Sequence, residues 1–292
     1  MNSETKGHLL NTASVIMVAI GPLLAKFGLG SVQPAQAAVI NTVTIILASL
    51  LYGFAAGRPV TFYREKKVMA LALFNTLGVI FLFLSLDLLS PVQIGFLGRF
   101  YTVFAVLLSV VLLREVLTKR EWGWIGAALA GVFLFVESGS GYTGQLTGTM
   151  FALMYTFFFA LTNIYIKRTL SDRREPNSLL FTSNTVTLAG VLLYAGISGG
   201  ITSSSWSVSG TALIVLSSLC SGFVGTILLY EALKYLRFSI ANATRAFSPV
   251  LLAVISYPFF PVPITWQNTA GAVILVGSIL FLSRQGKTKS SD

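Results

Sequence analysis

The sequence contains one cysteine, Cys220, and one histidine, His8, among its 292 residues. A single cysteine excludes a disulfide within the chain. One cysteine and one histidine also cannot form a Cys/His cluster with metal-ligand spacing. Neither residue has a second catalytic side chain beside it in the sequence, so a nucleophile with its base is not indicated. The sequence therefore predicts no enzyme, no metal site and no cofactor.

Charge is also scarce. Only 10% of the residues are charged, against about 25% in soluble domains, while 54% are hydrophobic and the mean hydropathy is +0.79. A chain this apolar is expected to fold with lipid as its solvent. The composition predicts one polytopic membrane domain over residues 1–292, with membrane lipids among its partners.

Apolar stretches of membrane-spanning length recur along the whole chain and are separated by Gly, Pro and charged clusters. They predict an all-α protein with ten transmembrane helices. The expected spans cover residues 9–28, 35–56, 68–86, 91–112, 122–136, 147–166, 178–196, 209–230, 239–259 and 267–283.

The basic residues give this segmentation an orientation. Every Lys and Arg except Lys26, Arg99 and Arg245 falls in segments that the ten spans place on one side of the membrane. Because basic loops stay cytoplasmic, both termini are expected in the cytoplasm of a multi-pass protein of the cell membrane. The net charge of +10 is spread along the membrane edge and forms no single basic element, so no nucleic-acid partner is predicted.

Two halves of the sequence resemble each other. "NTVTIILASLLYG" from Asn41 matches "NTVTLAGVLLYAG" from Asn184, and "GRFYTVFAVLLSV" at 98–110 matches "TRAFSPVLLAVIS" at 244–256, which aligns Arg99 with Arg245. We expect one repeat over about 8–140, a second over about 145–284, and a tail over 285–292. Because each repeat has an odd number of spans, the two should lie in the membrane with opposite orientations, an arrangement typical of transporters.

The segments "LGRFYTVFAVLLSVVLLREVLTKREWGWIGAALAGVFLF" and "TRAFSPVLLAVISYPFFPVPITWQNTAGAVILVGSILFL" resemble the two EamA-like repeats of the drug/metabolite transporter superfamily. The resemblance covers almost the whole chain. It implies a central cavity, walled partly by 91–112 and 239–259, through which small organic metabolites are exported or exchanged. The family's glutamate after the fourth helix is matched by Glu115, whereas the second repeat has Phe260–Pro263 there.

Arg99 and Arg245 are the centre of the expected substrate site. At 1.5 Å per residue, Arg99 lies about 12 Å into its span, too deep for its charge to reach the membrane surface comfortably. If both guanidinium groups face the cavity, they form a symmetric pair suited to a carboxylate or phosphate. Helical spacing adds Thr102 beside Arg99, and Asn242 and Ser248 beside Arg245. The alternative is a structural role, in which each arginine pairs with an acidic residue near a helix end: Asp87, Glu137 or Glu231.

Four further residues complete the expected site. Asn41 and Asn184 form a second symmetric pair, for which an interhelical hydrogen bond is the simpler role. Tyr101 and Tyr155 either line the cavity or fill the bundle.

No acidic residue lies in the middle of a span, which favours an anionic or zwitterionic solute such as an amino acid or organic acid. Two alternatives stay open. An aromatic cavity could serve an exporter of cations or amphipathic drugs, and the chain could be a membrane scaffold or lipid-handling protein that transports nothing. In each case a monomer is expected.

Overall fold

The computed structural model describes residues 3–113, 118–135, 142–170, 174–200, 206–232, 235, 248–260 and 265–285, and within these residues all regular structure is helical. The prediction of an all-α fold is confirmed over this part of the chain. The elements are α1 (Ser3–Leu29), α2 (Pro34–Ala55), α3 (Lys66–Leu88), α4 (Pro91–Leu97), the 3₁₀ turn η1 (Gly98–Phe100), α5 (Tyr101–Leu113), α6 (Lys119–Phe135), α7 (Tyr142–Leu170), α8 (Pro176–Ile197), α9 (Val208–Ser217), the π-helix η2 (Ser218–Val224), α10 (Gly225–Ala232), α12 (Ser248–Ser256) and α13 (Trp266–Gln285).

Six of the described helical stretches are long and apolar enough to cross a membrane. They are Thr5–Leu29, Pro34–Ala55, Lys66–Leu88, Gly144–Ile166, Pro176–Ile197 and Val208–Ala232. The expected ends are close to the observed ones: α2 was expected over 35–56, α3 over 68–86 and α8 over 178–196. Ten crossings and the orientation of the termini stay predictions.

Two expected spans are interrupted. Residues 91–112 were predicted as one continuous helix, but the 3₁₀ turn η1 separates α4 from α5 at Arg99. Residues 209–230 contain the π-helix η2 between α9 and α10. Such interruptions change the number of residues per turn, and π segments in particular are frequent at functional sites. Thr102 lies three residues after Arg99, and its place in the site stays a prediction.

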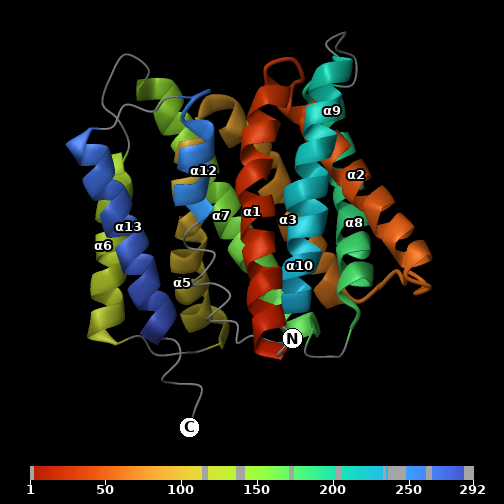
Figure 1. Cartoon of the computed structure of the whole chain (residues 1–292), viewed down its shortest axis with the longest axis horizontal. Coiled ribbons are helices and arrows are strands. Elements are labelled where there is room, and N and C mark those ends of the chain that lie inside the picture. The colour runs from red at the N-terminus through yellow and green to blue at the C-terminus, as the bar shows by residue number, and fades with distance from the viewer. Residues whose placement is uncertain are drawn as a thin grey trace.

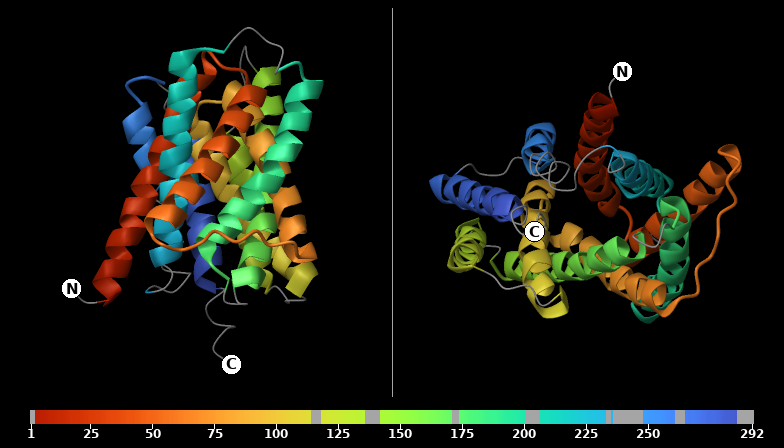
Figure 2. Two further views of the ribbon diagram at one scale, coloured as in Figure 1. Left: turned by 90° about the vertical axis from the view of Figure 1, so that its right-hand side faces the viewer. Right: turned by 90° about the horizontal axis from the view of Figure 1, so that it is seen from below.

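The helices stand side by side as a bundle, with α6 and α13 on one flank and α2 and α8 on the other (Figure 1). The first turn of α1 and the last turn of α13 lie at the same end of the bundle (Figure 1). Between α2 and α3, the extended 56–65 segment crosses the beginning of α8 (Figure 2).

The helix pairs follow a pattern. α3 packs along α7, and α9, η2 and α10 pack along α1; α2 packs on α8, and α6 on α13. In the middle, α4 contacts α12 and α5 contacts α7. The largest apolar cluster joins α3, α4 and α7 through Phe83, Leu97, Phe100 and Ala152, all less than a tenth exposed. Arg99 therefore lies next to the main core of the bundle.

Candidate functional site

Local sequence sets the position of Arg99. Ser90 begins α4: its Oγ accepts from the backbone N–H of Gln93 at 3.3 Å, and the Gln93 side chain accepts from the Ser90 N–H at 2.9 Å. Pro91 follows as the first helical residue, where its missing N–H costs nothing. This capping box fixes where α4 begins, and Arg99 follows in the 3₁₀ turn at its far end.

The Arg99 guanidinium connects two parts of the chain that are distant in sequence. Its Nη2 donates a hydrogen bond to Ser248 Oγ at 2.5 Å. Ser248 begins α12 and is only 5% exposed, while Arg99 is half-buried. A charged donor on a hydroxyl is a strong interaction in a low-dielectric site. Ser248 was expected beside Arg245; the observed contact is instead a direct bond from Arg99 in the first half of the chain to Ser248 in the second half.

Tyr155 on α7 closes another side of this region. Its side chain is 6% exposed, and its hydroxyl donates to the Ile94 carbonyl at 3.2 Å. A Cβ on Gly98 would lie 2.5 Å from the Tyr155 hydroxyl oxygen, so only glycine allows α7 to approach this closely. Thus α4, η1, α7 and α12 converge around Arg99.

Of the remaining predicted site residues, some lie within the described part of the structure and others lie outside it. Tyr101 is half-buried in the first turn of α5. Thr102 lies in the same turn, but its side chain is outside the described part of the structure. Arg245 and Asn242 fall in residues 236–247, also outside it, so the expected arginine pair stays a prediction.

The two aligned asparagines lie on neighbouring helices. Asn184 on α8 is 3% exposed and donates to the Leu180 carbonyl of its own helix at 2.9 Å. Asn41 on α2 is half-buried and faces the π-helix, its Oδ1 being 3.7 Å from where a Cβ of Gly222 would lie. This hydrogen bond of the Asn184 side-chain amide is made within α8, and the interhelical bond expected for the two asparagines stays a prediction.

Lys26 has a partner that sequence analysis did not find. Its Nζ donates to the carbonyls of Leu86 and Asp87 at 2.8 and 2.7 Å. These carbonyls lie in the last turn of α3, where a helix leaves its acceptors unpaired and carries partial negative charge. Lys26 therefore joins α1 to the end of α3.

A second polar cluster joins α3 to α8. Thr187 Oγ1 lies 3.1 Å from Asn75 Nδ2, which donates to it, and 3.2 Å from Thr76 Oγ1. It also donates to the Ala72 carbonyl at 3.3 Å. Polar residues within apolar helices are expected to bond across helices, and that signal could have identified this cluster.

The beginning of α8 is bound to the 56–65 segment. Ser178 Oγ accepts from the Thr61 N–H at 3.1 Å, and Thr182 Oγ1 accepts from the Tyr63 N–H at 3.1 Å. Arg174 forms an ion pair with Glu65 and lies 4.6 Å from the centre of the Tyr63 ring. These contacts hold the connection between α2 and α3 against the second half of the chain.

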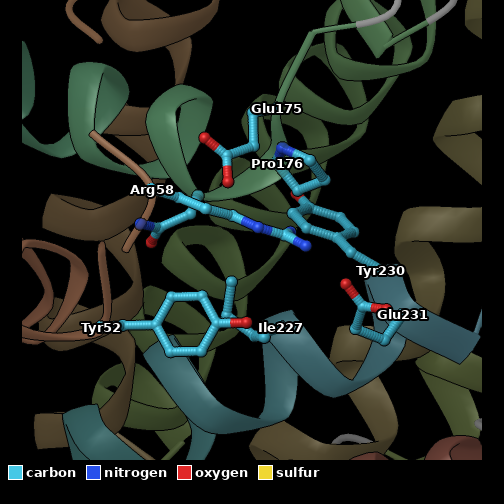
Figure 3. Close-up of a pocket in the computed structure, with 8 residues that line it drawn as sticks. Tyr52, Arg58, Glu175, Pro176, Ile227, Tyr230 and Glu231 are labelled. Atoms are coloured by element: carbon cyan, nitrogen blue, oxygen red, sulfur yellow. The ribbon is translucent and has the colours of Figure 1, made fainter. Parts of the chain in front are cut away.

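Beside these contacts lies a small pocket of about 70 Å³. It opens where α2 ends, α8 begins and α10 ends, as Figure 3 shows. Its walls are Tyr52, Arg58, Glu175, Pro176, Asn177, Ile227, Tyr230 and Glu231. No cluster of three or more potential metal-binding side chains occurs among the described residues.

A bundle in which six of the described helical stretches are long and apolar enough to span a membrane is typical of a multi-pass membrane protein. The chain belongs to the EamA-like transporter family, whose model matches it twice, over residues 5–137 and 146–284. The protein is accordingly a membrane transporter of small molecules, and the resemblance inferred from the sequence is confirmed.

Two comparisons extend this assignment. The chain is 26% identical over 260 residues to the Golgi GDP-fucose transporter of Drosophila melanogaster, a match that covers 83% of this chain and 76% of the relative. A solved crystal structure, described only as that of a protein, superposes with a TM-score of 0.63 at 16% identity, covering 99% of this chain and all of the other. The second likeness concerns the fold alone.

Proposed function

We propose that the protein is an alternating-access transporter of a small anionic or zwitterionic metabolite, built from two inverted five-helix repeats. In this proposal the chain crosses the cell membrane ten times, and both termini lie in the cytoplasm. The solute binds between the repeats, with Arg99 as its main anchor.

Three observations support the duplicated architecture. The family model matches two consecutive segments whose limits lie close to the expected repeats at 8–140 and 145–284. If the first repeat is mapped onto the second, α1 corresponds to α7, α2 to α8, α3 to α9–α10 and α6 to α13. Under this mapping the contact of α3 with α7 becomes the contact of α1 with α9, η2 and α10. The contacts of α2 with α8 and of α6 with α13 map onto themselves. α1 begins and α13 ends at one end of the bundle, as an even number of crossings requires (Figure 1).

The observation that carries the proposal is the bond between the Arg99 guanidinium and Ser248 Oγ. This bond brings a permanent positive charge of the first half of the chain against α12 of the second half, which supports a site between the proposed repeats. A carboxylate or phosphate can accept from this guanidinium with two charged oxygens, so such a solute can displace the Ser248 hydroxyl. GDP-fucose, the substrate named for the Drosophila relative, is itself a phosphate-bearing anion.

We assign Arg245 and Asn242 to the matching position in the second repeat. Solute would contact Arg99 when the site is open to the outside and Arg245 when it is open to the cytoplasm. Because Ser248 belongs to the repeat that contains Arg245, rocking between the two states changes the distance between Arg99 and Ser248. Solute binding is thereby coupled to the relative position of α4 and α12.

Uptake into proteoliposomes tests this function. With a panel of labelled amino acids, organic acids and sugar phosphates, we expect one anionic or zwitterionic class to be transported. Arg99→Gln and Arg245→Gln should each reduce its initial rate at least about tenfold, the loss expected for one charged anchor. Arg99→Lys should retain more activity, because the charge remains while the two-pronged geometry is lost.

The same experiment separates the alternatives. Transport of quaternary ammonium compounds that both glutamine variants leave unchanged would indicate a cation exporter with an aromatic cavity. If no panel member is transported and none raises the melting temperature of the purified protein, the scaffold or lipid-handling alternative is favoured. Normal anion transport by the double glutamine variant would remove both arginines from the mechanism.

A further inference from the structure

The pocket at the end of the bundle is separate from Arg99, and both halves of the chain contribute to it. Tyr52 and Arg58 come from the end of α2 and the segment that follows it. Glu175 and Asn177 come from the beginning of α8, and Glu231 from the end of α10. Charges of both signs therefore face one small volume.

The Arg58 side chain reaches into this volume, between Glu175 and the Tyr52 and Ile227 side chains, with its guanidinium toward Tyr230 and Glu231 (Figure 3). Its backbone N–H donates to the Gly53 carbonyl at 2.9 Å, which fixes where the side chain begins. Within the described residues, its guanidinium makes no hydrogen bond or ion pair. It is the group in the pocket that is open to an anion.

Asn177 supplies a second polar group to the wall of the pocket. The residue is 3% exposed, and its Nδ2 donates to the Ser49 carbonyl at 3.0 Å. Its Oδ1 is buried and has no hydrogen-bond partner among the described residues. Buried polar atoms are nearly always paired, so an exception requires an explanation. An amide oxygen accepts hydrogen bonds, and an ammonium group is a suitable donor.

The two carboxylates favour a cation at the same place. Glu175 accepts from Ser178 Oγ at 3.1 Å, which holds this carboxylate at the beginning of α8. Glu231 lies on the opposite wall, and the Tyr52 and Tyr230 rings add faces that attract a cation. The Glu175 and Glu231 carboxylates would repel a ligand that carries only negative charge, and the Arg58 guanidinium would repel one that carries only positive charge. A ligand that carries one group of each sign can place its anionic group on Arg58 and its cationic group near the carboxylates.

We propose that this pocket binds a zwitterionic headgroup, with an anionic group on Arg58 and an ammonium on Asn177 Oδ1 and Glu231. A volume of about 70 Å³ holds a headgroup only, so the rest of the ligand extends outside. Free amino acids and aminophospholipids such as phosphatidylethanolamine share this chemistry. The site itself is independent of the transport mechanism proposed above.

Binding to the purified full-length protein tests the site. In detergent without lipid, we expect glycine to raise the melting temperature, whereas acetate and methylammonium at the same concentration should not. Arg58→Gln and Glu231→Gln should each weaken glycine binding at least about tenfold, the effect of one charge-assisted contact. Arg64→Gln is the matched control, because Arg64 is an exposed arginine of the same segment that does not line the pocket.

A second arm identifies the source of the headgroup. Glycine binding lost in Arg58→Gln supports the site and assigns it to a free solute. Stabilisation in nanodiscs only when phosphatidylethanolamine is added to phosphatidylcholine, again lost in Arg58→Gln, supports the site and assigns it to a lipid. Equal responses to glycine and acetate, or an unchanged response in Arg58→Gln, would overturn it. Glycine binding that Arg99→Gln abolishes and Arg58→Gln spares would refute the pocket while leaving the proposed function intact.

Discussion

Gly98 shows at the scale of one residue how the candidate site is held. A Cβ at this position would lie 2.5 Å from the Tyr155 hydroxyl oxygen but 3.7 Å from the ring carbon that bears it. Gly98→Ala should therefore force α7 or the 3₁₀ turn to move, at a cost of about 1–3 kcal/mol. The melting temperature in detergent should fall accordingly, and transport should fall with it, because Arg99 is the next residue.

Repeating Gly98→Ala in a Tyr155→Phe variant tests whether the Tyr155 hydroxyl is the source of the strain. Without the hydroxyl, the nearest atom is at ordinary contact distance, so Gly98→Ala should cost clearly less there than in the natural chain. Tyr155→Phe alone should cost about 1 kcal/mol, the value of one buried hydrogen bond, here that to the Ile94 carbonyl. Additive effects of the two substitutions would show that the contact is not the source of the strain.

At the scale of helices, Thr187 is the central residue of the contact between α3 and α8. Thr187→Val keeps the shape but leaves the Asn75 amide and the Thr76 hydroxyl without this acceptor. We expect a loss of about 1 kcal/mol, within the range for such bonds in membranes. Thr185→Val is the control, because within the described part of the chain Thr185 bonds only the Phe181 carbonyl of its own helix. Equal melting temperatures for the two variants would contradict the bridging role.

The ends of the helices were largely predictable, while their interruptions were not. Pro34, Ser90 and Pro176 mark helix starts by local chemistry that sequence alone displays. The 3₁₀ turn at Arg99 and the π-helix at 218–224 differ from an α-helix in which carbonyl each backbone N–H bonds. The residue types of an apolar run do not indicate this choice of acceptor. The partner of Arg99 on α12 is a tertiary neighbour, which helical spacing within one span does not reach.

The candidate site divides in the same way. A deep arginine in an apolar run drew attention to Arg99, and helical spacing placed Ser248 beside Arg245; the bond from Arg99 to Ser248 appears only in the tertiary fold. The partner of Lys26 could not be predicted, because the acceptors are backbone carbonyls of α3, about 60 residues away in sequence. Main-chain acceptors carry no residue signature, so only the tertiary fold identifies them.

For the whole molecule, the proposed mechanism requires the ends of the bundle to face opposite sides of the membrane. Two exposed positions near opposite ends of α8, Arg64 and Ser198, test this. Cys220 is the only thiol and is half-buried, so a Cys220→Ala background allows single cysteines to be introduced elsewhere. Arg64→Cys should react with a membrane-impermeant maleimide only in inside-out vesicles, and Ser198→Cys only in right-side-out vesicles, because basic segments remain cytoplasmic.

The same labelling tests the inversion of the repeats. Lys119→Cys follows the fourth expected span and should react on the same side as Arg64→Cys, because two further crossings separate them. Trp206→Cys, before α9, should react on the side of Ser198→Cys, since no crossing separates them. If Lys119→Cys reacts on the opposite side instead, the first repeat contains an even number of spans. The two halves would then be parallel, and a rocking motion could not expose Arg99 and Arg245 to opposite sides in turn.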